Sequence, residues 1–299
     1  FQTDIVFHRL GLAIIDEQHR FGVAQRLLLR EKGKDLTPHQ LIMTATPIPR
    51  TLAMTHFADL DVSVIDALPP GRTPVDTRLL NQTRAAEITT RLDAQFNEGG
   101  QAYWVCTLIE ETDQSIAEAA ETRAEKLKQQ LPHRRVGLVH GRMKADDKSQ
   151  VMAAFSHGDL DLLVATTVIE VGVNVPNANI MVIENPERLG LAQLHQLRGR
   201  VGRGARVSFC LLLAGDAISQ QSRDRLNLLK ETSDGFILAE ADLQLRGPGD
   251  VIGTRQTGEL SFRVADLTQH AGLLDEIASL AETIRAGPPR VREQLIERW

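Results

Sequence analysis

The stretch "QAYWVCTLIEETDQSIAEAAETRAEKLKQQLPHRRVGLVH" (101–140) decides the fold class, because it predicts a strand, a helix and a second strand in succession. Short apolar runs at 101–107 and 136–140 are typical of buried strands, whereas apolar residues recur at helical spacing over 115–131. A helix that joins two such strands favours a parallel sheet with helices on both faces.

The helix predicted over 115–131 has a signal at each end. Ser115 and Glu118 fit a capping box at its start, and Pro132 follows its end. The apolar residues on its predicted buried face are Ile116, Ala120, Leu127 and Leu131.

The same alternation of strands and helices runs along most of the chain, so we predict the α/β class. Strands are predicted at 11–16, 40–45, 62–66, 75–80, 101–107, 136–140, 161–166, 179–184 and 207–213. The segment 67–74, rich in Pro and Gly, is the best candidate for a linker between two α/β lobes. After residue 215 the pattern is mainly helical, with an irregular Gly-rich stretch at 243–262 and a helix at 266–286.

Composition is that of an ordinary globular protein, with 299 residues, 42% hydrophobic residues, 24% charged residues and a formal charge of −5. Cys106 and Cys210 lie in apolar runs, so we expect buried thiols in a reducing compartment and no disulfide. No apolar run approaches the roughly 20 residues that cross a membrane. The chain begins at Phe1, and we expect residues to precede it in the whole protein.

Two acids follow the first predicted strand directly. Asp16 and Glu17 stand where one carboxylate could hold a metal ion and the other could act on water, as in nucleotide hydrolysis. A solvated turn after a strand is the simpler interpretation of such a pair. His19, taken alone, is equally consistent with a polar packing residue.

Paired hydroxyl residues follow two later strands. Thr44 and Thr46 follow the strand at 40–45, and Thr166 and Thr167 end the strand at 161–166. Hydroxyls and backbone amides at Thr166 and Thr167 could hold a phosphate, and a strand followed by an ordinary loop is the alternative. For Thr44 and Thr46, hydroxyl caps of a strand-to-helix turn are the simpler interpretation.

The most specific stretch is "QLHQLRGRVGRG" (193–204), which mixes arginine and glycine. From Arg188 to Arg206 there are five arginines and no Asp or Glu. Arginine stabilises the charge that develops on a transferred phosphoryl group, and a carboxylate in this stretch would repel a polyphosphate. A basic surface helix is the alternative. The residues of the pattern Q-x-x-G-R-x-x-R are Gln196, Gly199, Arg200 and Arg203.

These stretches, in this order, resemble the motifs of superfamily II helicases and translocases. "DEQH" (16–19) resembles motif II, "TAT" (44–46) motif III, "ATTVIEVGVN" (165–174) motif V and "QLHQLRGRVGR" (193–203) motif VI. The long runs 16–33, 44–75 and 182–204 resemble the bacterial RecG branch of ATP-dependent DNA helicases. So does "SDGFILAEADLQLRGPGDVIGTRQTGE" (233–259), which is similar to a translocation motif shared with the transcription-repair coupling factor.

The resemblance implies RecA-like parallel sheets: part of a first helicase lobe (1–70), a complete second lobe (75–214) and a translocation region with a helical tail (215–299). It implies ATP and Mg²⁺ as cofactors and branched double-stranded DNA, such as stalled forks and Holliday junctions, as substrate in recombination and repair. It further implies a single-stranded-DNA-binding protein as partner, a monomer, no membrane, and a place at the nucleoid in the bacterial cytoplasm.

The resemblance also implies a role for each motif residue. Asp16 would hold Mg²⁺ through water, Glu17 would polarise the attacking water, and Arg200 and Arg203 would be arginine fingers. Gln196 would lie beside them, and His19 would link the acidic pair to the Thr44–Thr46 turn. Gly172 and Asn174 would line the nucleotide cleft, although Asn174 stands where many relatives carry Asp. The residues expected near DNA or in coupling are Thr44, Thr46, Arg50, Thr166, Thr167, Arg246, Arg255 and Gln256.

One expected motif is missing from the sequence. A P-loop needs G-x-x-x-x-G-K-[ST], but the Gly33–Lys34 pair is followed by Asp35 and preceded by Leu28 where the first Gly should stand. We therefore expect the P-loop and a DNA-gripping wedge domain upstream, and no ATPase activity from this chain alone. Two other functions stay open: a transcription-repair coupling translocase, and a non-enzymatic nucleic-acid-binding module.

Overall fold

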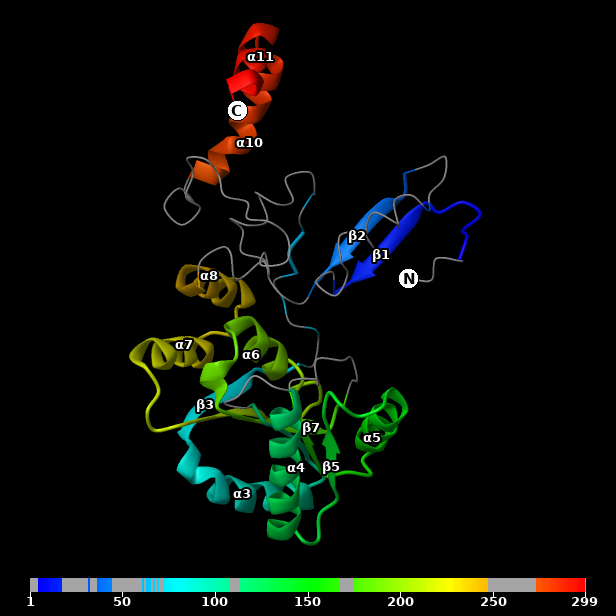
Figure 1. Ribbon diagram of the computed structural model, residues 1–299, viewed down its shortest axis with the longest axis vertical. Helices are drawn as coiled ribbons and strands as arrows, with labels where there is room; N and C mark the ends of the chain where they lie inside the picture. The colour runs from blue at the N-terminus through cyan, green and yellow to red at the C-terminus, as the bar shows by residue number, and fades with distance from the viewer. Residues whose placement is uncertain are drawn as a thin grey trace. The chain divides into compact units, whose positions relative to one another are not determined.

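A computed structural model describes the residues 5–17, 32, 37–44, 61, 63–65, 67, 69, 72–107, 113–166, 175–246 and 273–298 (Figure 1). The chain divides into two compact units, Phe1–Pro47 and Ile48–Trp299. Because the segment 45–60 lies outside the described residues, the predicted lobe boundary near residue 70 stays a prediction.

The first unit contains two parallel strands, β1 (Leu12–Asp16) and β2 (His39–Met43). They match the strands predicted at 11–16 and 40–45. Ala13 and Ile15 are buried on one face of this pair. The register aligns Asp16 with Met43, so the carboxyl ends of both strands lie at the same edge.

The second unit is built on a six-stranded, fully parallel sheet in the order β3-β8-β7-β4-β6-β5. Every residue of the central strands β4, β6 and β7 is buried, which explains their continuous apolar sequences. The strands are β3 (Val75–Asn81), β4 (Gln101–Val105), β5 (Val136–Val139), β6 (Leu162–Ala165), β7 (Ala178–Glu184) and β8 (Ser208–Ala214).

Helices cover both faces of this sheet, as predicted (Figure 1). On one face Leu92 of α3 and Leu127 of α4 pack on the sheet around Trp104. On the other face Phe155 of α5, Leu194 of α6 and neighbouring helices pack around Tyr103 and other strand residues. The helices are α3 (Ala85–Asn97), α4 (Asp113–Gln130), α5 (Ala145–His157), α6 (Leu191–Arg198), α7 (Gln220–Glu231) and α8 (Gly235–Arg246), with short 3₁₀ turns η2 (Gln82–Arg84) and η4 (Pro186–Arg188).

The predicted interior is confirmed where it can be compared. Ala120, Leu127 and Leu131 are buried, and Cys106 and Cys210 are buried free thiols. Burial raises the pKa of both thiols, that of Cys210 to about 12, so neither is a reactive thiolate at neutral pH.

Three details of the sequence analysis are wrong. Helix α4 begins at Asp113, so Ser115 lies inside the helix and is not its N-cap; an acid in the first turn favours this earlier start. Residues 63–65 are not in a strand, because a short apolar run forms a strand only where a neighbouring strand supplies hydrogen bonds. Residues 243–246 belong to α8, since its helical spacing continues up to the glycine and proline that follow.

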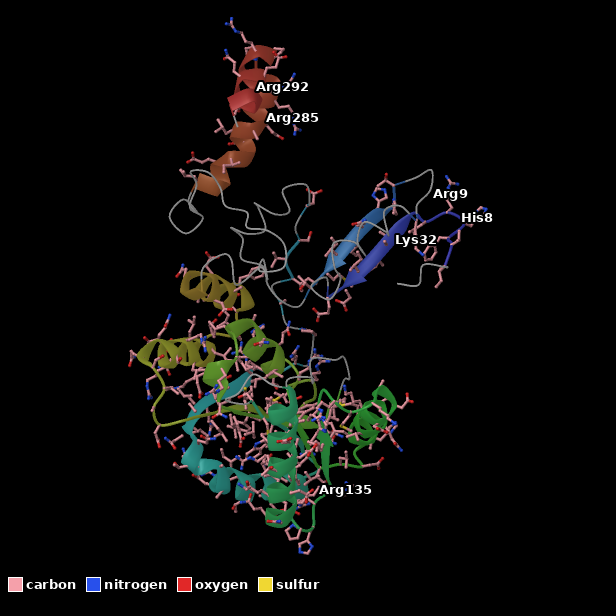
Figure 2. All side chains as sticks on the ribbon, in the orientation of Figure 1. His8, Arg9, Lys32, Arg135, Arg285 and Arg292 are labelled. Atoms are coloured by element: carbon pink, nitrogen blue, oxygen red, sulfur yellow. The ribbon has the colours of Figure 1, made fainter. Side chains whose placement is uncertain are left out.

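The C-terminal part contains the pair α10 (Leu274–Ala286) and α11 (Pro289–Arg298). Helix α10 matches the end of the helix predicted at 266–286, whereas α11 was not predicted; its proline stands at the first helical position, where proline is well tolerated. The exposed side chains of Arg285 and Arg292 extend from these helices (Figure 2). Within the part of the chain that the structure describes, no helix has the length and apolar character to cross a membrane.

Candidate functional site

The acidic pair lies at the carboxyl end of β1 in the first unit. Asp16 is the last residue of the strand, and its Oδ1 accepts a hydrogen bond of 2.9 Å from the Glu17 amide. Glu17 has φ of 52°, which is uncommon for a residue other than glycine and costs conformational energy. Because β1 and β2 are parallel, Thr44, the residue after β2, lies at the same edge as the acids. The structure therefore brings motif II and the start of motif III together.

The donor atoms at this edge fit Mg²⁺. Among the residues that the structure describes, no group of three or more His, Cys, Asp or Glu side chains could hold a metal ion. Mg²⁺ does not need such a group, because it is commonly held by one or two carboxylates together with substrate phosphates and water. The exposed carboxylate of Asp16 is suited to that role.

The arginine-rich turn, residues 199–206, follows α6 in the second unit. Arg206 Nη2 donates to the Glu98 carbonyl oxygen at 2.5 Å, shortly before β4 begins. Gly202, with φ of 78°, lies so close to Val75, the first residue of β3, that a Cβ would be 2.9 Å from its Cγ2. A Cβ on Gly204 would collide with the Pro176 carbonyl oxygen, just before β7. These contacts fix the turn at the amino ends of the strands.

Ligand sites of open α/β sheets usually lie in loops after the carboxyl ends of strands. That rule holds for Asp16, Glu17 and Thr44 but not for Arg200 and Arg203. The reason is topological: α6 starts after the carboxyl end of β7 and leads back across the sheet, so the residues that follow it emerge at the opposite edge.

The arginines of this stretch have different tasks. Arg198 is 5% exposed, and its Nη1 donates to the carbonyl oxygens of Leu229 at 2.6 Å and Thr232 at 2.8 Å. Arg198 thus binds carbonyl oxygens at the carboxyl end of α7. Arg206 likewise binds the carbonyl oxygen of Glu98, in the turn before β4. Only part of the acid-free stretch is therefore available to a polyphosphate, and Arg200 and Arg203 remain the candidates. Arg200 is half-buried, Arg203 is exposed, and Gln196 lies half-buried one turn earlier on α6.

The titratable groups His195 and Tyr103, next to this turn, are neutral at pH 7. Burial, followed by the like charges of Arg198 and Arg72, lowers the pKa of His195 to about 4, so its imidazole is neutral at pH 7. Burial raises the pKa of Tyr103 to about 12, although the cations of Arg200 and Arg203 oppose this shift. Tyr103 therefore contributes no negative charge. Guanidinium groups in such surroundings are suited to phosphate.

The sequence analysis missed Arg72 at this turn. Arg72 Nη2 donates to the Gly199 carbonyl oxygen at 2.8 Å and approaches that of Val201 at 3.5 Å. The sequence offered only an arginine in a Pro- and Gly-rich linker, more than a hundred residues away from the turn. No local pattern could have joined the two.

The carboxyl edge of the six-stranded sheet carries other polar groups. Thr166 follows β6, is buried, and donates its amide to the Val139 carbonyl oxygen at 3.2 Å. Thr107 Oγ1 donates to the Glu184 carbonyl oxygen at 2.6 Å, and the Glu184 carboxylate pairs with Arg123 at 2.8 Å. Burial raises the pKa of Glu184, and the Arg123 cation opposes that shift. Thr107, Arg123 and Glu184 were not singled out from the sequence, because each lies in a strand or helix pattern that explained it already.

Several predicted site residues lie outside the described part of the chain. For Arg246 the structure gives the backbone at the end of α8 but not the side chain. The others are His19, Thr46, Arg50, Thr167, Gly172, Asn174, Arg255 and Gln256.

Comparisons with known proteins agree with the motifs. A model of the helicase conserved C-terminal domain matches residues 84–205, and a model of the C-terminal part of domain 3 of ATP-dependent DNA helicase RecG matches residues 232–294. Curated relatives named ATP-dependent DNA helicase RecG include those of Escherichia coli (strain K12), 59% identical over 100% of this chain, and Acidithiobacillus ferridurans, 54% identical over 100%. The chain spans 44% and 43% of the lengths of these two relatives.

Among solved structures, a RecG is similar to this chain in both sequence and fold. A RecG bound to a three-way DNA junction is 46% identical, with a TM-score of 0.70, over 91% of this chain and 34% of that one. Dbp5 of S. cerevisiae, solved with RNA and ADP BeF3, is 14% identical with a TM-score of 0.52, over 81% of this chain and 63% of that one, and shares the fold alone. High identity along the whole chain, together with the match to RecG domain 3, shows that the chain belongs to the RecG family of DNA helicases.

Proposed function

We propose that this chain supplies the second motor lobe and the following helical region of an ATP-dependent translocase. Its substrate would be branched double-stranded DNA, such as stalled forks and Holliday junctions, in recombination and repair. The name of the curated relatives and the three-way junction bound by a solved RecG support this proposal. The observation that carries it is the turn 199–206, whose position at the sheet's amino edge is fixed by Arg72 and Arg206.

In this proposal the acidic pair and the arginines have different tasks in ATP hydrolysis. Asp16 would hold Mg²⁺, and Glu17 would polarise the attacking water. Arg200 and Arg203 stabilise the charge that develops on the transferred phosphoryl group. Bound Mg²⁺ would neutralise charge on the phosphates. Gln196, beside the arginines on α6, would help to orient them or the nucleotide.

DNA is assigned to the other edge of the six-stranded sheet. Helices α4 and α5 follow β4 and β5, so their N-termini point toward the carboxyl edge. Arg142 and Lys144, in the connection between β5 and α5, are exposed. Such groups bind phosphates without reading bases, which suits an enzyme that moves along DNA of any sequence. Thr166, in the stretch that resembles motif V, follows the neighbouring strand β6.

The activity requires parts that this chain does not contain. The sequence has no P-loop, so we infer that the β- and γ-phosphates are held by an upstream segment and that this chain alone does not hydrolyse ATP. A transcription-repair coupling translocase receives less support, because the RecG domain 3 model matches the C-terminal part. The single-stranded-DNA-binding protein as partner, the monomer and the nucleoid location remain proposals from the family resemblance.

The test uses the full-length protein and a synthetic three-way junction. We expect ATP- and Mg²⁺-dependent unwinding, with ATP turnover stimulated by the junction and lost in Glu17→Gln. This chain alone should turn over ATP no faster than the same chain carrying Glu17→Gln. Junction binding without any ATP turnover by the full-length protein would instead identify a non-enzymatic nucleic-acid-binding module.

A further inference from the structure

The segment 72–75 lies along the whole arginine-rich turn. Arg72 donates to the Gly199 carbonyl oxygen at 2.8 Å, and Thr73 Oγ1 donates to the Arg206 carbonyl oxygen at 3.4 Å. Val75 leaves no space for a side chain at Gly202. The turn is thus supported over its length by the end of the predicted linker (67–74) and the first residue of β3. None of these contacts belongs to a helix or strand ladder.

The carbonyl groups bound by Arg72 need a donor from outside the helix. Helix α6 ends at Arg198, and the amides of Arg200 and Val201 donate back to Leu197 and Arg198 at 3.0 and 3.3 Å. The carbonyl oxygens of Gly199 and Val201 lie beyond this last turn, where helical acceptors lose their intrahelical partners. A planar guanidinium can reach both, as Arg72 does.

Arg72 also shares an acceptor with one of the proposed arginine fingers. The Gly199 carbonyl oxygen accepts from Arg203 Nε at 3.4 Å as well as from Arg72 Nη2 at 2.8 Å. Two guanidinium groups therefore converge on one oxygen, with Arg200 next to it in the chain. Their mutual repulsion is unfavourable, and an anion bound at the turn would relieve it.

We propose that Arg72 is a positioning residue, which holds the turn 199–202 so that Arg200 and Arg203 are in place before the nucleotide arrives. This inference rests on the proposed function, because it assumes that these arginines act on the phosphoryl group. Arg72 acts through the turn and does not itself contact the reacting atoms. Preorganisation of this kind affects the rate more than binding, since displacement of a catalytic group by about 1 Å can cost about 100-fold.

The experiment compares Arg72→Ala, Arg72→Lys and the control Arg91→Ala in the full-length protein. Arg91 is a matched arginine on α3 whose side chain is 70% exposed and pairs with Glu87. Junction-stimulated ATP turnover gives kcat and KM for ATP, and hydrogen exchange reports the amides of residues 199–206. We expect Arg72→Ala to lower kcat by about 10- to 100-fold, with KM changed less than about threefold. Arg72→Lys recovers part of kcat because an ammonium can still donate to the Gly199 carbonyl oxygen.

Exchange should become faster in residues 199–206 of Arg72→Ala and stay unchanged elsewhere and in Arg91→Ala. Normal kcat in Arg72→Ala would overturn the inference. So would reduced kcat with unchanged exchange in the turn, which would mean direct contact with the nucleotide, and so would faster exchange throughout the lobe, which would mean general destabilisation. The proposed function fails separately, if Arg200→Ala and Arg203→Ala retain normal turnover.

Discussion

The two edges of the six-stranded sheet differ in what holds their polar groups. At the carboxyl edge, Thr107 and Glu184 are buried and held by short contacts within the edge itself. At the amino edge, the turn 199–206 is held by Arg72 and by the bond of its own Arg206 to Glu98, while Arg200 and Arg203 keep access to solvent. The carboxyl edge thus forms a fixed surface, and the amino edge presents cations on a supported turn.

This difference follows from the direction of the chain. In a parallel sheet with helical crossovers, residues directly after strands appear at one edge and residues after helices at the other. The stretch 167–174 connects Thr166 at the carboxyl edge with Val175, just before β7, at the amino edge, but lies outside the described residues. In our proposal DNA and nucleotide use opposite edges of one rigid sheet.

Among the changes that distinguish the two edges of the sheet, replacement of the proposed arginine fingers should have the largest effect. Arg200→Ala and Arg203→Ala in the full-length protein should each lower junction-stimulated ATP turnover by about 10³- to 10⁵-fold. Binding of the junction should change little, because the fingers lie away from the proposed DNA edge. Turnover and fluorescence-anisotropy titrations with the same junction measure both. Loss of junction binding parallel to turnover would show that the two edges do not have separate roles.

A smaller effect is expected on stability from Arg198. Arg198→Ala removes the charge-assisted hydrogen bonds to the carbonyl oxygens of Leu229 and Thr232, together with the contact to His195 Nδ1. Each such bond contributes about 1.5–3 kcal/mol, so the free energy of unfolding of the second unit should fall by several kcal/mol. Denaturant unfolding of the full-length protein, with the exposed Arg91→Ala as control, measures the loss. An unchanged unfolding midpoint would show that Arg198 does not support α7.

The smallest expected effect is on the pH dependence of stability, through His195. The pKa of His195 is about 4 in the folded protein and close to its ordinary value of 6.5 in the unfolded chain. Below pH 6.5 the unfolded chain therefore binds the proton more readily, and this contribution to stability decreases as the pH falls from 6.5 to 4. His195→Gln should flatten the pH dependence of the unfolding midpoint in this window. An identical slope in the variant would contradict the buried, neutral imidazole.

Local patterns were sufficient to predict most of the fold. Strands such as β4 and β7 are short apolar runs, and their order with helices fixed the parallel α/β class. Boundaries were less predictable: an acid at Asp113 extended α4 beyond the expected cap at Ser115. Residues 63–65, within the strand expected at 62–66, show that a short apolar run alone does not make a strand.

The candidate site was only partly predictable for a related reason. Asp16, Glu17 and Thr44 follow strands, so parallel pairing was enough to bring them together. Arg200 and Arg203 were found from their motif. The edge of the sheet at which they lie depends on the direction of α6, which the motif does not give. Arg72 and the separate tasks of Arg198 and Arg206 depend on carbonyl oxygens of distant segments, which no side-chain pattern records.

The assignment of the nucleotide to the amino edge is the central claim, and photolabelling tests it most directly. An ATP analogue with a photoreactive group on its γ-phosphate is bound to the full-length protein with the junction, and labelled peptides are mapped by mass spectrometry. Within the second unit, we predict labelling of the turn 199–206, suppressed by excess ATP. ATP-protected labelling at the carboxyl edge, around Thr107 and Asn185, with none in the turn, would contradict the account.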